Sequence, residues 1–189
     1  MKKNKVFVLL LGKSGVGKTT IADYMERNYG LKQVVSYTNR PQRFEGEVGH
    51  KFLTEQNVEK IKEMFPNMVA ADTYDGHFYF ATAEQVEECD VYVINPSAVE
   101  QFKASYHGDK LIKVVQIEDL PENIVKHMLQ RGDSLDKIQR RQEFDAKEFA
   151  GSRKLCDLVL ANTGIERTAR ALHAAIWGWN VIAETESED

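Results

Sequence analysis

Four short runs of apolar residues recur along the chain, and each is followed by a stretch with the spacing of a helix. The runs are KVFVLLL (5–11), DVYVIN (90–95), KLIKVVQI (110–117) and DLVLA (157–161). The helical stretches cover residues 18–29, 96–106, 121–131 and 165–177. Nearly continuous apolar character is typical of strands that are buried on both faces of a parallel sheet. The pattern therefore predicts an α/β fold built on a parallel sheet flanked by helices.

Residues typical of helix starts occur at three places. Thr82 with Gln85, and Thr163 with Glu166, fit the capping box, in which each side chain accepts a hydrogen bond from the other residue's backbone N–H. Pro121 suits a first helical turn, where its missing N–H costs no hydrogen bond. These residues mark the expected boundaries of their helices.

Two segments do not follow this alternation. Residues 36–80 hold aromatic, turn-rich strand candidates that favour a small antiparallel flap: HKFLT (50–54), NMVAADTY (67–74) and HFYFA (77–81). Residues 131–153 are strongly charged and predict a mobile helical segment. We expect one domain with these two insertions, a core of residues 1–35, 81–130 and 154–182, and a frayed acidic tail at 183–189.

Composition excludes several classes of partner. The 189 residues fit one domain, and the 42% of hydrophobic residues are enough for a sizeable core. A formal net charge of -4 gives no overall basic field, so we expect no nucleic-acid partner and only local phosphate binding. No apolar run approaches the roughly 18 residues of a membrane helix, so no membrane partner is expected. Cys89 and Cys156 lack metal-type spacing, which favours reduced thiols in a cytoplasmic protein.

The stretch GKSGVGKT fits the phosphate-loop motif G-x-x-x-x-G-K-[ST] in full, between a predicted strand and a predicted helix. Its glycines let backbone N–H groups converge on phosphate oxygens, and the helix N-terminus adds a positive dipole. In such loops the lysine, here Lys18, reaches the β- and γ-phosphates, and the hydroxyl of Thr19 ligates Mg²⁺. We therefore expect ATP and Mg²⁺ as cofactors. The candidate ATP-binding residues of this segment are Gly12, Lys13, Ser14, Gly15, Val16, Gly17, Lys18, Thr19 and Thr20.

Phosphate-loop proteins divide mainly into kinases, GTPases and larger ATPases. The chain has no Asn-Lys-x-Asp element, which a GTPase needs to read guanine. It is also short for an oligomeric motor and lacks a clear strand that ends in paired acids. A small-molecule kinase is the class that these observations favour.

An ordered set of further motifs resembles the guanylate kinases over nearly the whole chain. SYTNRP (36–41), Arg43, EGE (45–47) and HKF (50–52) resemble the acceptor-binding arm of that family. DGHFYFAT (75–82) is similar to its Gly-Asn-Tyr-Tyr-Gly-Thr turn, and LQRGDSLDKIQRRQ (129–142) to its lid. DLVLAN, which ends at Asn162, resembles its last strand. The resemblance implies a P-loop NTPase fold with an acceptor-binding flap and a helical lid.

The resemblance also implies roles for individual side chains. Planar guanidinium groups hold a phosphomonoester dianion well, and the arm supplies Arg40 and Arg43. In the lid, Arg131 and Arg141 match residues that close over the transferred phosphoryl group and neutralise its charge. The implied catalytic residues are Lys18, Arg40, Arg131 and Arg141. Asn162 is added to the ATP-binding residues, and the implied acceptor-binding residues are Ser36, Arg40, Arg43, His50, Asp72, Tyr79 and Asn95.

The positions that read the acceptor base depart from the family pattern. The family binds guanine with a flap glutamate and an Asp-x-Asp pair, and these positions hold Ala70, Val93 and Asn95 here. Ala81 stands where the family has threonine or serine after the turn. Asp72 lies two residues from Ala70 and so faces the same side of a strand. We hypothesise that Asp72 replaces the missing acid and that Asn95 accepts through its carbonyl; the alternative for Asp72 is a solvent-facing aspartate.

The resemblance implies transfer of the γ-phosphoryl group of ATP to a nucleoside monophosphate, with GMP or dGMP as the first candidate. No general base is expected, because the attacking phosphate oxygen is already ionised. Ribose 1,5-bisphosphate phosphokinases offer a second interpretation, since they have a histidine in the arm and Asn-x-Ser after the middle strand, similar to His50 and to Asn95 with Ser97. The acceptor would then be a small sugar phosphate. A guanylate-kinase-like interaction module that binds peptides is a third interpretation, although such modules generally lack a working phosphate loop. We expect a monomer or a homodimer.

Overall fold

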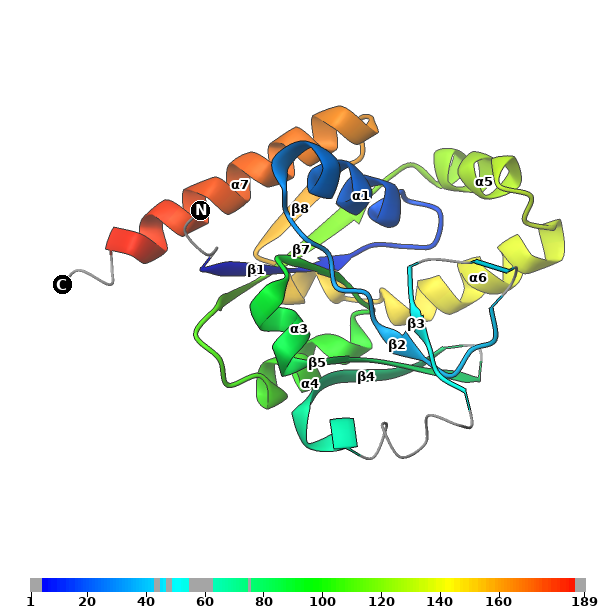
Figure 1. Ribbon diagram of the computed structural model, residues 1–189. Helices are drawn as coiled ribbons and strands as arrows, with labels where there is room; N and C mark the ends of the chain where they lie inside the picture. The colour runs from blue at the N-terminus through cyan, green and yellow to red at the C-terminus, as the bar shows by residue number, and fades with distance from the viewer. Residues whose placement is uncertain (1–4, 43–44, 47–48, 55–62, 75, 186–189) are drawn as a thin grey trace.

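The central sheet is parallel and has the strand order β6-β1-β7-β8. The computed structural model describes residues 5–42, 45–46, 49–54, 63–74 and 76–185. The strands of this sheet are β1 (Val6–Leu11), β6 (Val91–Val93), β7 (Leu111–Glu118) and β8 (Leu158–Ala161). Helices lie on both faces of the sheet, with α1 (Lys18–Tyr29) and α7 (Ile165–Thr185) on one face and α4 (Ser97–Ser105) on the other (Figure 1). The other described helices are α3 (Ala83–Glu88), α5 (Pro121–Gln130) and α6 (Leu135–Glu148). The predicted α/β architecture is confirmed.

Strand β1 lies between β6 and β7, and all six of its side chains are fully buried. Successive side chains of a strand point to opposite faces. Val6, Val8 and Leu10 accordingly pack in one cluster with residues of α1 and α7. Phe7, Leu9 and Leu11 pack in a second cluster with residues of α4 and of the second sheet. Burial on both faces explains why the sequence of this strand is apolar without alternation.

A second sheet of mixed direction forms beside the first, with the order β3-β2-β5-β4. Its strands are β2 (Tyr37–Thr38), β3 (Lys51–Phe52), β4 (Met68–Tyr74) and β5 (His77–Thr82). β5 pairs antiparallel with both β4 and β2, as expected for a flap. The expectation of a purely antiparallel flap is wrong, because β3 pairs parallel to β2. Short 3₁₀ turns, η2 (Phe65–Asn67) and η3 (Ser152–Leu155), precede β4 and β8.

Helix boundaries agree with the capping residues at two of the three expected places. Gln85 accepts from the Thr82 N–H at 3.1 Å in a capping box at the start of α3, and Pro121 opens α5. The box expected for Thr163 and Glu166 is wrong. The Thr163 N–H donates to the Thr168 hydroxyl at 3.2 Å, and Glu166 instead pairs with Arg170. α7 also continues to Thr185, well past the predicted end at residue 177.

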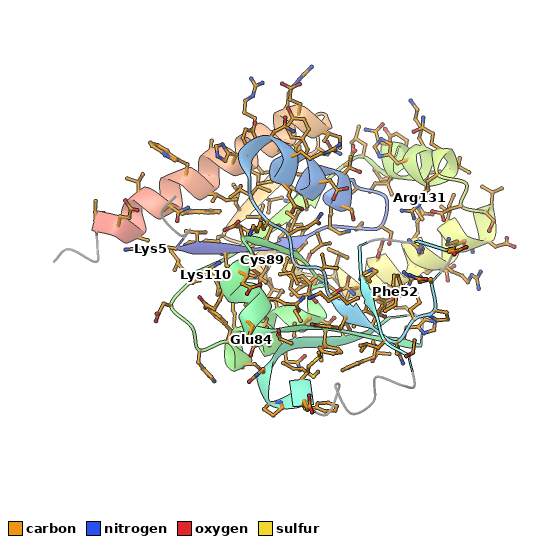
Figure 2. All side chains as sticks on the ribbon, in the orientation of Figure 1. Lys5, Phe52, Glu84, Cys89, Lys110 and Arg131 are labelled. Atoms are coloured by element: carbon orange, nitrogen blue, oxygen red, sulfur yellow. The ribbon has the colours of Figure 1, made fainter. Side chains whose placement is uncertain are left out.

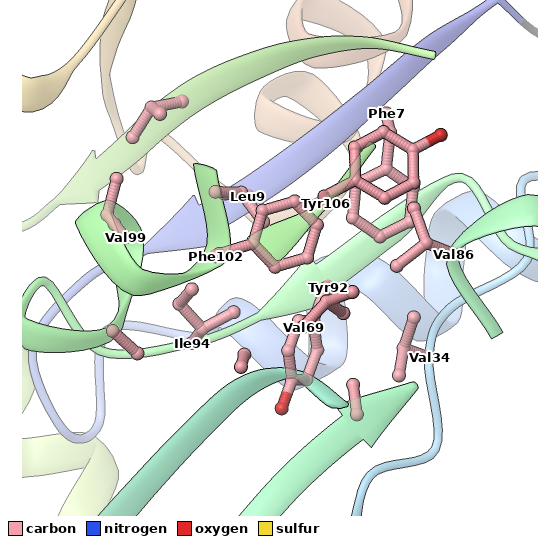
Figure 3. Packing of buried hydrophobic residues seen from close by; sticks show 14 of the residues in the cluster. Phe7, Leu9, Val34, Val69, Val86, Tyr92, Ile94, Val99, Phe102 and Tyr106 are labelled. Atoms are coloured by element: carbon pink, nitrogen blue, oxygen red, sulfur yellow. The ribbon is translucent and has the colours of Figure 1, made fainter. Parts of the chain in front are cut away.

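The two sheets share one hydrophobic core (Figure 3). Phe102 of α4 stacks against Phe7 of β1, with ring centroids 5.7 Å apart, and against Tyr106 at 5.8 Å. Val69 and Ala81 of the second sheet belong to the same cluster. Continuous packing of this kind fixes the second sheet against the central sheet. Among the described helices, none is long and apolar enough to cross a membrane.

Candidate functional site

The phosphate loop connects β1 to α1 and is pressed against neighbouring elements. Gly15 has a φ of 82°, and a Cβ added there would lie 2.7 Å from the Met128 side chain and 3.0 Å from the Ile124 carbonyl oxygen. A side chain at Gly12 would lie 2.8 Å from the Ile117 carbonyl oxygen. Only glycine fits these two positions without a shift of β7 or α5. The loop is therefore held at the carboxyl end of β1, the end of the sheet at which α/β proteins bind ligands.

Lys18 is half-buried at the first turn of α1. Its ammonium group donates to the carbonyl oxygens of Gly12 and, at 3.1 Å, of Lys13. Desolvation lowers the pKa of Lys18 to about 8; the carboxylate of Asp145 opposes this shift, and the charge of Arg141 adds to it. The lysine is thus held as a cation in a poorly solvated place where an anionic ligand would stabilise its charge.

Binding of a nucleotide triphosphate is expected to weaken as the pH rises above about 8, because Lys18 loses its proton in the free protein there. A bound polyphosphate raises this pKa again, so binding at higher pH takes up a proton. Calorimetric affinities for ATP between pH 7 and pH 10 check this expectation. The variant Lys18→Arg stays charged over that range and is expected to show no such fall in affinity. Equal pH profiles for the two proteins would contradict the assignment.

A cavity of about 600 Å³ opens on one side of the loop. It is lined by Ser14, Gly15, Gly17, Lys18, Thr19, Thr20, His127, Gln130, Arg131, Arg141 and Ile165. Arg131 lies at the end of α5 (Figure 2) and pairs with the buried carboxylate of Asp133, which also binds Lys137 at 2.7 Å. Desolvation raises the pKa of Asp133, but the hydrogen bonds of Lys137 and Arg131 outweigh it and hold the pKa below its ordinary value. Asp133 therefore stays ionised and holds Arg131 in the wall of this cavity.

A second cavity, of about 240 Å³, lies between the loop, the second sheet and α6. It is lined by Gly12, Ser14, Lys18, Ser36, His50, Ala70, Ala71, Asp72, Tyr79, Tyr92, Val93, Ile94, Asn95, Ala98, Arg141 and Asp145. The Ser36 hydroxyl and His50 Nδ1 form a hydrogen bond of 2.9 Å, and the rings of His50 and Tyr79 meet edge to face. Burial raises the pKa of Tyr92, so its hydroxyl stays protonated beside Ser36. Hydroxyl, phenol and imidazole groups suited to a phosphate ester thus meet in this cavity.

Asp72 and Asn95 form a pair in the wall of the second cavity. The Asn95 amide nitrogen donates to Asp72 Oδ2 at 2.6 Å, and Asp72 Oδ1 accepts from the Thr73 N–H at 2.8 Å. Asp72 lies opposite Tyr79 in the β4–β5 ladder, so both side chains share one face of the sheet. The bond to Asp72 turns the amide nitrogen of Asn95 toward the carboxylate, which leaves the Asn95 carbonyl oxygen as the acceptor atom of this amide.

Three side chains line both cavities: Ser14, Lys18 and Arg141. The two cavities therefore meet at the phosphate loop, and the meeting point carries two cationic side chains. A phosphoryl group bound at this point would be in contact with a ligand in either cavity.

Several predicted site residues lie elsewhere. Arg40 is buried, lines neither cavity, donates to the Pro41 carbonyl oxygen at 2.9 Å and places its guanidinium 5.1 Å from the centre of the Phe52 ring. Arg43 lies outside the described residues. Asn162 contacts the loop itself, because its amide donates to the Val16 carbonyl oxygen at 2.9 Å and its side-chain oxygen accepts from the Gly164 N–H. It supports the conformation of the loop, and binding of ATP by Asn162 stays a prediction.

Asp145 of α6 is a site residue that the sequence motifs do not contain. It is buried and accepts a hydrogen bond from the Ser14 backbone N–H at 2.7 Å. Helical spacing offers a signal that could have found it: Ile138, Arg141 and Asp145 are three and then four residues apart and so share one face of α6. The apolar residue at the start of that face indicates that the face is turned inward.

Thr19 is the residue predicted to ligate Mg²⁺. It is exposed at the start of α1 and lines the 600 Å³ cavity. Among the described residues no cluster of three or more His, Cys, Asp or Glu side chains is arranged to hold a metal ion. Ligation of Mg²⁺ by Thr19 stays a prediction.

No protein-family model matches the chain, and no curated protein matches it in sequence. Its structure is similar to the crystal structure of guanylate kinase from Anaplasma phagocytophilum, with a TM-score of 0.61 and 20% sequence identity. The match covers 93% of this chain and 87% of that chain. The chain therefore has the α/β P-loop fold of that protein.

Proposed function

We propose that the protein is an ATP-dependent phosphotransferase that moves the γ-phosphoryl group of ATP to a nucleoside monophosphate. GMP or dGMP is the first candidate for this acceptor. The observation that carries this proposal is the meeting of the two cavities at Ser14, Lys18 and Arg141. The donor triphosphate binds in the cavity of the phosphate loop, and the acceptor binds against the second sheet. Similarity of the fold to a guanylate kinase supports the same activity.

In the proposed reaction an ionised oxygen of the acceptor phosphate attacks the γ-phosphorus of ATP in line with the leaving oxygen. The bond between the γ-phosphorus and the bridging oxygen breaks, and ADP leaves. Lys18 and Arg141 neutralise charge on the transferred group, while Arg131 closes the donor side from the end of α5. Mg²⁺, held through Thr19, would neutralise β- and γ-phosphate charge. The walls of the cavities align the two phosphates and exclude water.

Acceptor preference rests on the pair of Asp72 and Asn95. Guanine presents N–H donors at N1 and N2, and this pair presents a carboxylate and an amide oxygen at the wall of the acceptor cavity. Ala70 and Val93 line the same cavity and supply no polar group to a base. We therefore propose that Asp72 and Asn95 together read the acceptor base, in place of the acids of the guanylate kinases.

Ala70 and Val93 give the acceptor cavity apolar side chains at positions where a guanine pocket has acids. This favours a second candidate function, a kinase of a small sugar phosphate such as ribose 1,5-bisphosphate, which has no base to be recognised. Such an acceptor needs hydrogen-bonding partners for hydroxyl groups, and Ser36, His50 and Tyr79 offer them. A peptide-binding module without catalysis is less well supported, because the loop, Lys18 and Arg141 are all in place.

The activity is tested by ADP release from Mg·ATP with each acceptor separately: GMP, dGMP, AMP, UMP, CMP and ribose 1,5-bisphosphate. We expect turnover with GMP and dGMP. Turnover with the sugar bisphosphate alone would replace the first proposal by the second. Binding of ATP without turnover on any acceptor would contradict both.

Replacing Asp72 by alanine is expected to raise the KM for GMP about ten- to hundredfold, because base N–H groups then face the cavity wall without a carboxylate. The KM for ATP is expected to stay unchanged. Initial rates with either substrate varied check this split. Asp109→Ala, which removes an exposed aspartate of a surface loop, is the matched control. An unchanged KM for GMP would contradict a role of Asp72 in acceptor binding and would favour the alternative of a solvent-facing aspartate.

A further inference from the structure

Asp145 is a buried carboxylate that the proposed transfer does not use. It is 6% exposed, its Oδ2 accepts from the Ser14 N–H at 2.7 Å, and its Oδ1 lies 3.4 Å from the Ser14 hydroxyl. A buried carboxylate is costly unless strong hydrogen bonds or charges compensate. The loop N–H and the nearby charge of Lys18 provide this compensation. The lid helix α6 is therefore attached to the phosphate loop through an anion of its own.

Two of the groups that would bind a polyphosphate, the Ser14 N–H and the Lys18 ammonium, are already engaged by the protein. In a phosphate loop, successive backbone N–H groups converge on one anion. Here the Ser14 N–H of the loop donates its hydrogen bond to the carboxylate of Asp145. The Lys18 ammonium donates to the carbonyl oxygens of Gly12 and Lys13. Ser14 and Lys18 also line the cavity in which the donor is proposed to bind. The carboxylate of Asp145 beside Ser14 would therefore repel the negative charge of a bound triphosphate.

We propose that Asp145 is an intramolecular competitor of the donor phosphates, which docks α6 on the empty loop and leaves Ser14 when the donor binds. The inference rests on the proposed donor site. Only molecules in which Asp145 has left Ser14 can bind the donor. The apparent dissociation constant for the donor equals the intrinsic constant divided by the fraction of such molecules, so the contact lowers donor affinity. It also couples the donor to the lid, since Arg141 lies one turn from Asp145 on the same helix. Displacement of Asp145 by the donor therefore repositions a residue that lines both cavities.

The test compares Asp145→Asn with the wild-type protein and with Glu143→Gln. Asparagine keeps the size and the acceptor oxygen of Asp145 but removes its charge. Glu143→Gln removes a charge from an exposed position of the same helix and is the matched control. Calorimetric dissociation constants are measured for inorganic pyrophosphate, for ADP and for GMP. Thermal unfolding of each variant shows whether its fold is intact.

We expect the dissociation constant of Asp145→Asn for pyrophosphate to be at least about threefold lower than that of the wild type. A factor of this size follows if the loop of the wild type is accessible in about a third of the molecules or fewer. ADP is expected to gain by a similar factor. GMP is expected to gain less, because Asp145 only lines the acceptor cavity and does not occupy a hydrogen-bond donor proposed for GMP. Glu143→Gln is expected to match the wild type. The gain is expected to persist at about 0.5 M salt, because salt screens a long-range repulsion but not a direct competition.

Equal or weaker pyrophosphate binding by Asp145→Asn would overturn the inference, and weaker binding would make Asp145 a support of the loop. A gain that disappears in salt would overturn direct competition. Phosphotransfer is not the readout, so a failure of the proposed function on every acceptor leaves this comparison decisive. If no version of the protein binds pyrophosphate, the donor site and this inference fail together.

Discussion

Replacing Lys18 by methionine is expected to reduce kcat/KM for phosphoryl transfer about a thousandfold. Methionine keeps an unbranched side chain but has no charge to neutralise the transferred group, and loss of one preorganised donor of this kind costs factors of this order. Lys18 is also the side chain with the lowered pKa at the meeting point of the two cavities. Steady-state kinetics with ATP and GMP measure the effect.

The same substitution is expected to leave thermal stability unchanged or slightly raised, because burial penalises the charged form of Lys18 in the folded protein. Loss of activity together with retained stability separates a role in transfer from a structural role. Lys147→Met, at an exposed position of α6, is the control and is expected to keep full activity. Full activity of Lys18→Met would contradict the proposed donor site.

Replacing Phe102 by alanine is expected to lower the free energy of unfolding by about 3–5 kcal/mol. The ring is fully buried, and it stacks against the rings of Phe7 and Tyr106. Removing it leaves a cavity in the core that joins the two sheets. For a chain of this size the melting temperature is expected to fall by roughly 10 °C. Urea unfolding followed by circular dichroism measures the change.

Phe65→Ala is the control for this prediction. Phe65 is 56% exposed in the 3₁₀ turn η2, so its loss is expected to change stability by less than about 0.5 kcal/mol. A similar effect of both substitutions would contradict the shared core. Because Val69 and Ala81 pack in the same cluster as Phe102, the cavity is also expected to weaken acceptor binding at temperatures well below unfolding.

The parts of the fold that follow from local chemistry could be predicted from the sequence. β1 and α1 lie where the apolar run and the phosphate loop indicate, because burial on both faces and the loop glycines each constrain the sequence strongly. The extent of α7 could not be predicted from Gly178, because packing against β1 and α1 outweighs the helix propensity of one glycine. The parallel pairing of β3 depends on tertiary contacts that two residues cannot encode.

The candidate site was predictable where a motif carries the chemistry. Ser36, His50, Asp72, Tyr79 and Asn95 all line one cavity, as the ordered motifs imply. The contact of Asp145 with Ser14 joins residues far apart in the chain, and no local pattern specifies such a pair. Arg40 illustrates the opposite case: a charged residue in a matched motif packs on the ring of Phe52, because a guanidinium group also stacks well on aromatic faces.

The central position of β1 has a consequence for synthesis of the chain. β1 is made before both of its partner strands, which end at residues 93 and 118. At the usual rate of translation, the ribosome needs on the order of ten seconds to make both partners. During that time six consecutive apolar residues, three of which have high β-propensity, have no strand to pair with, and exposed apolar segments of this kind favour aggregation of nascent chains. Expression at lower temperature, or with chaperones that bind exposed apolar segments, is therefore expected to raise the yield of folded protein.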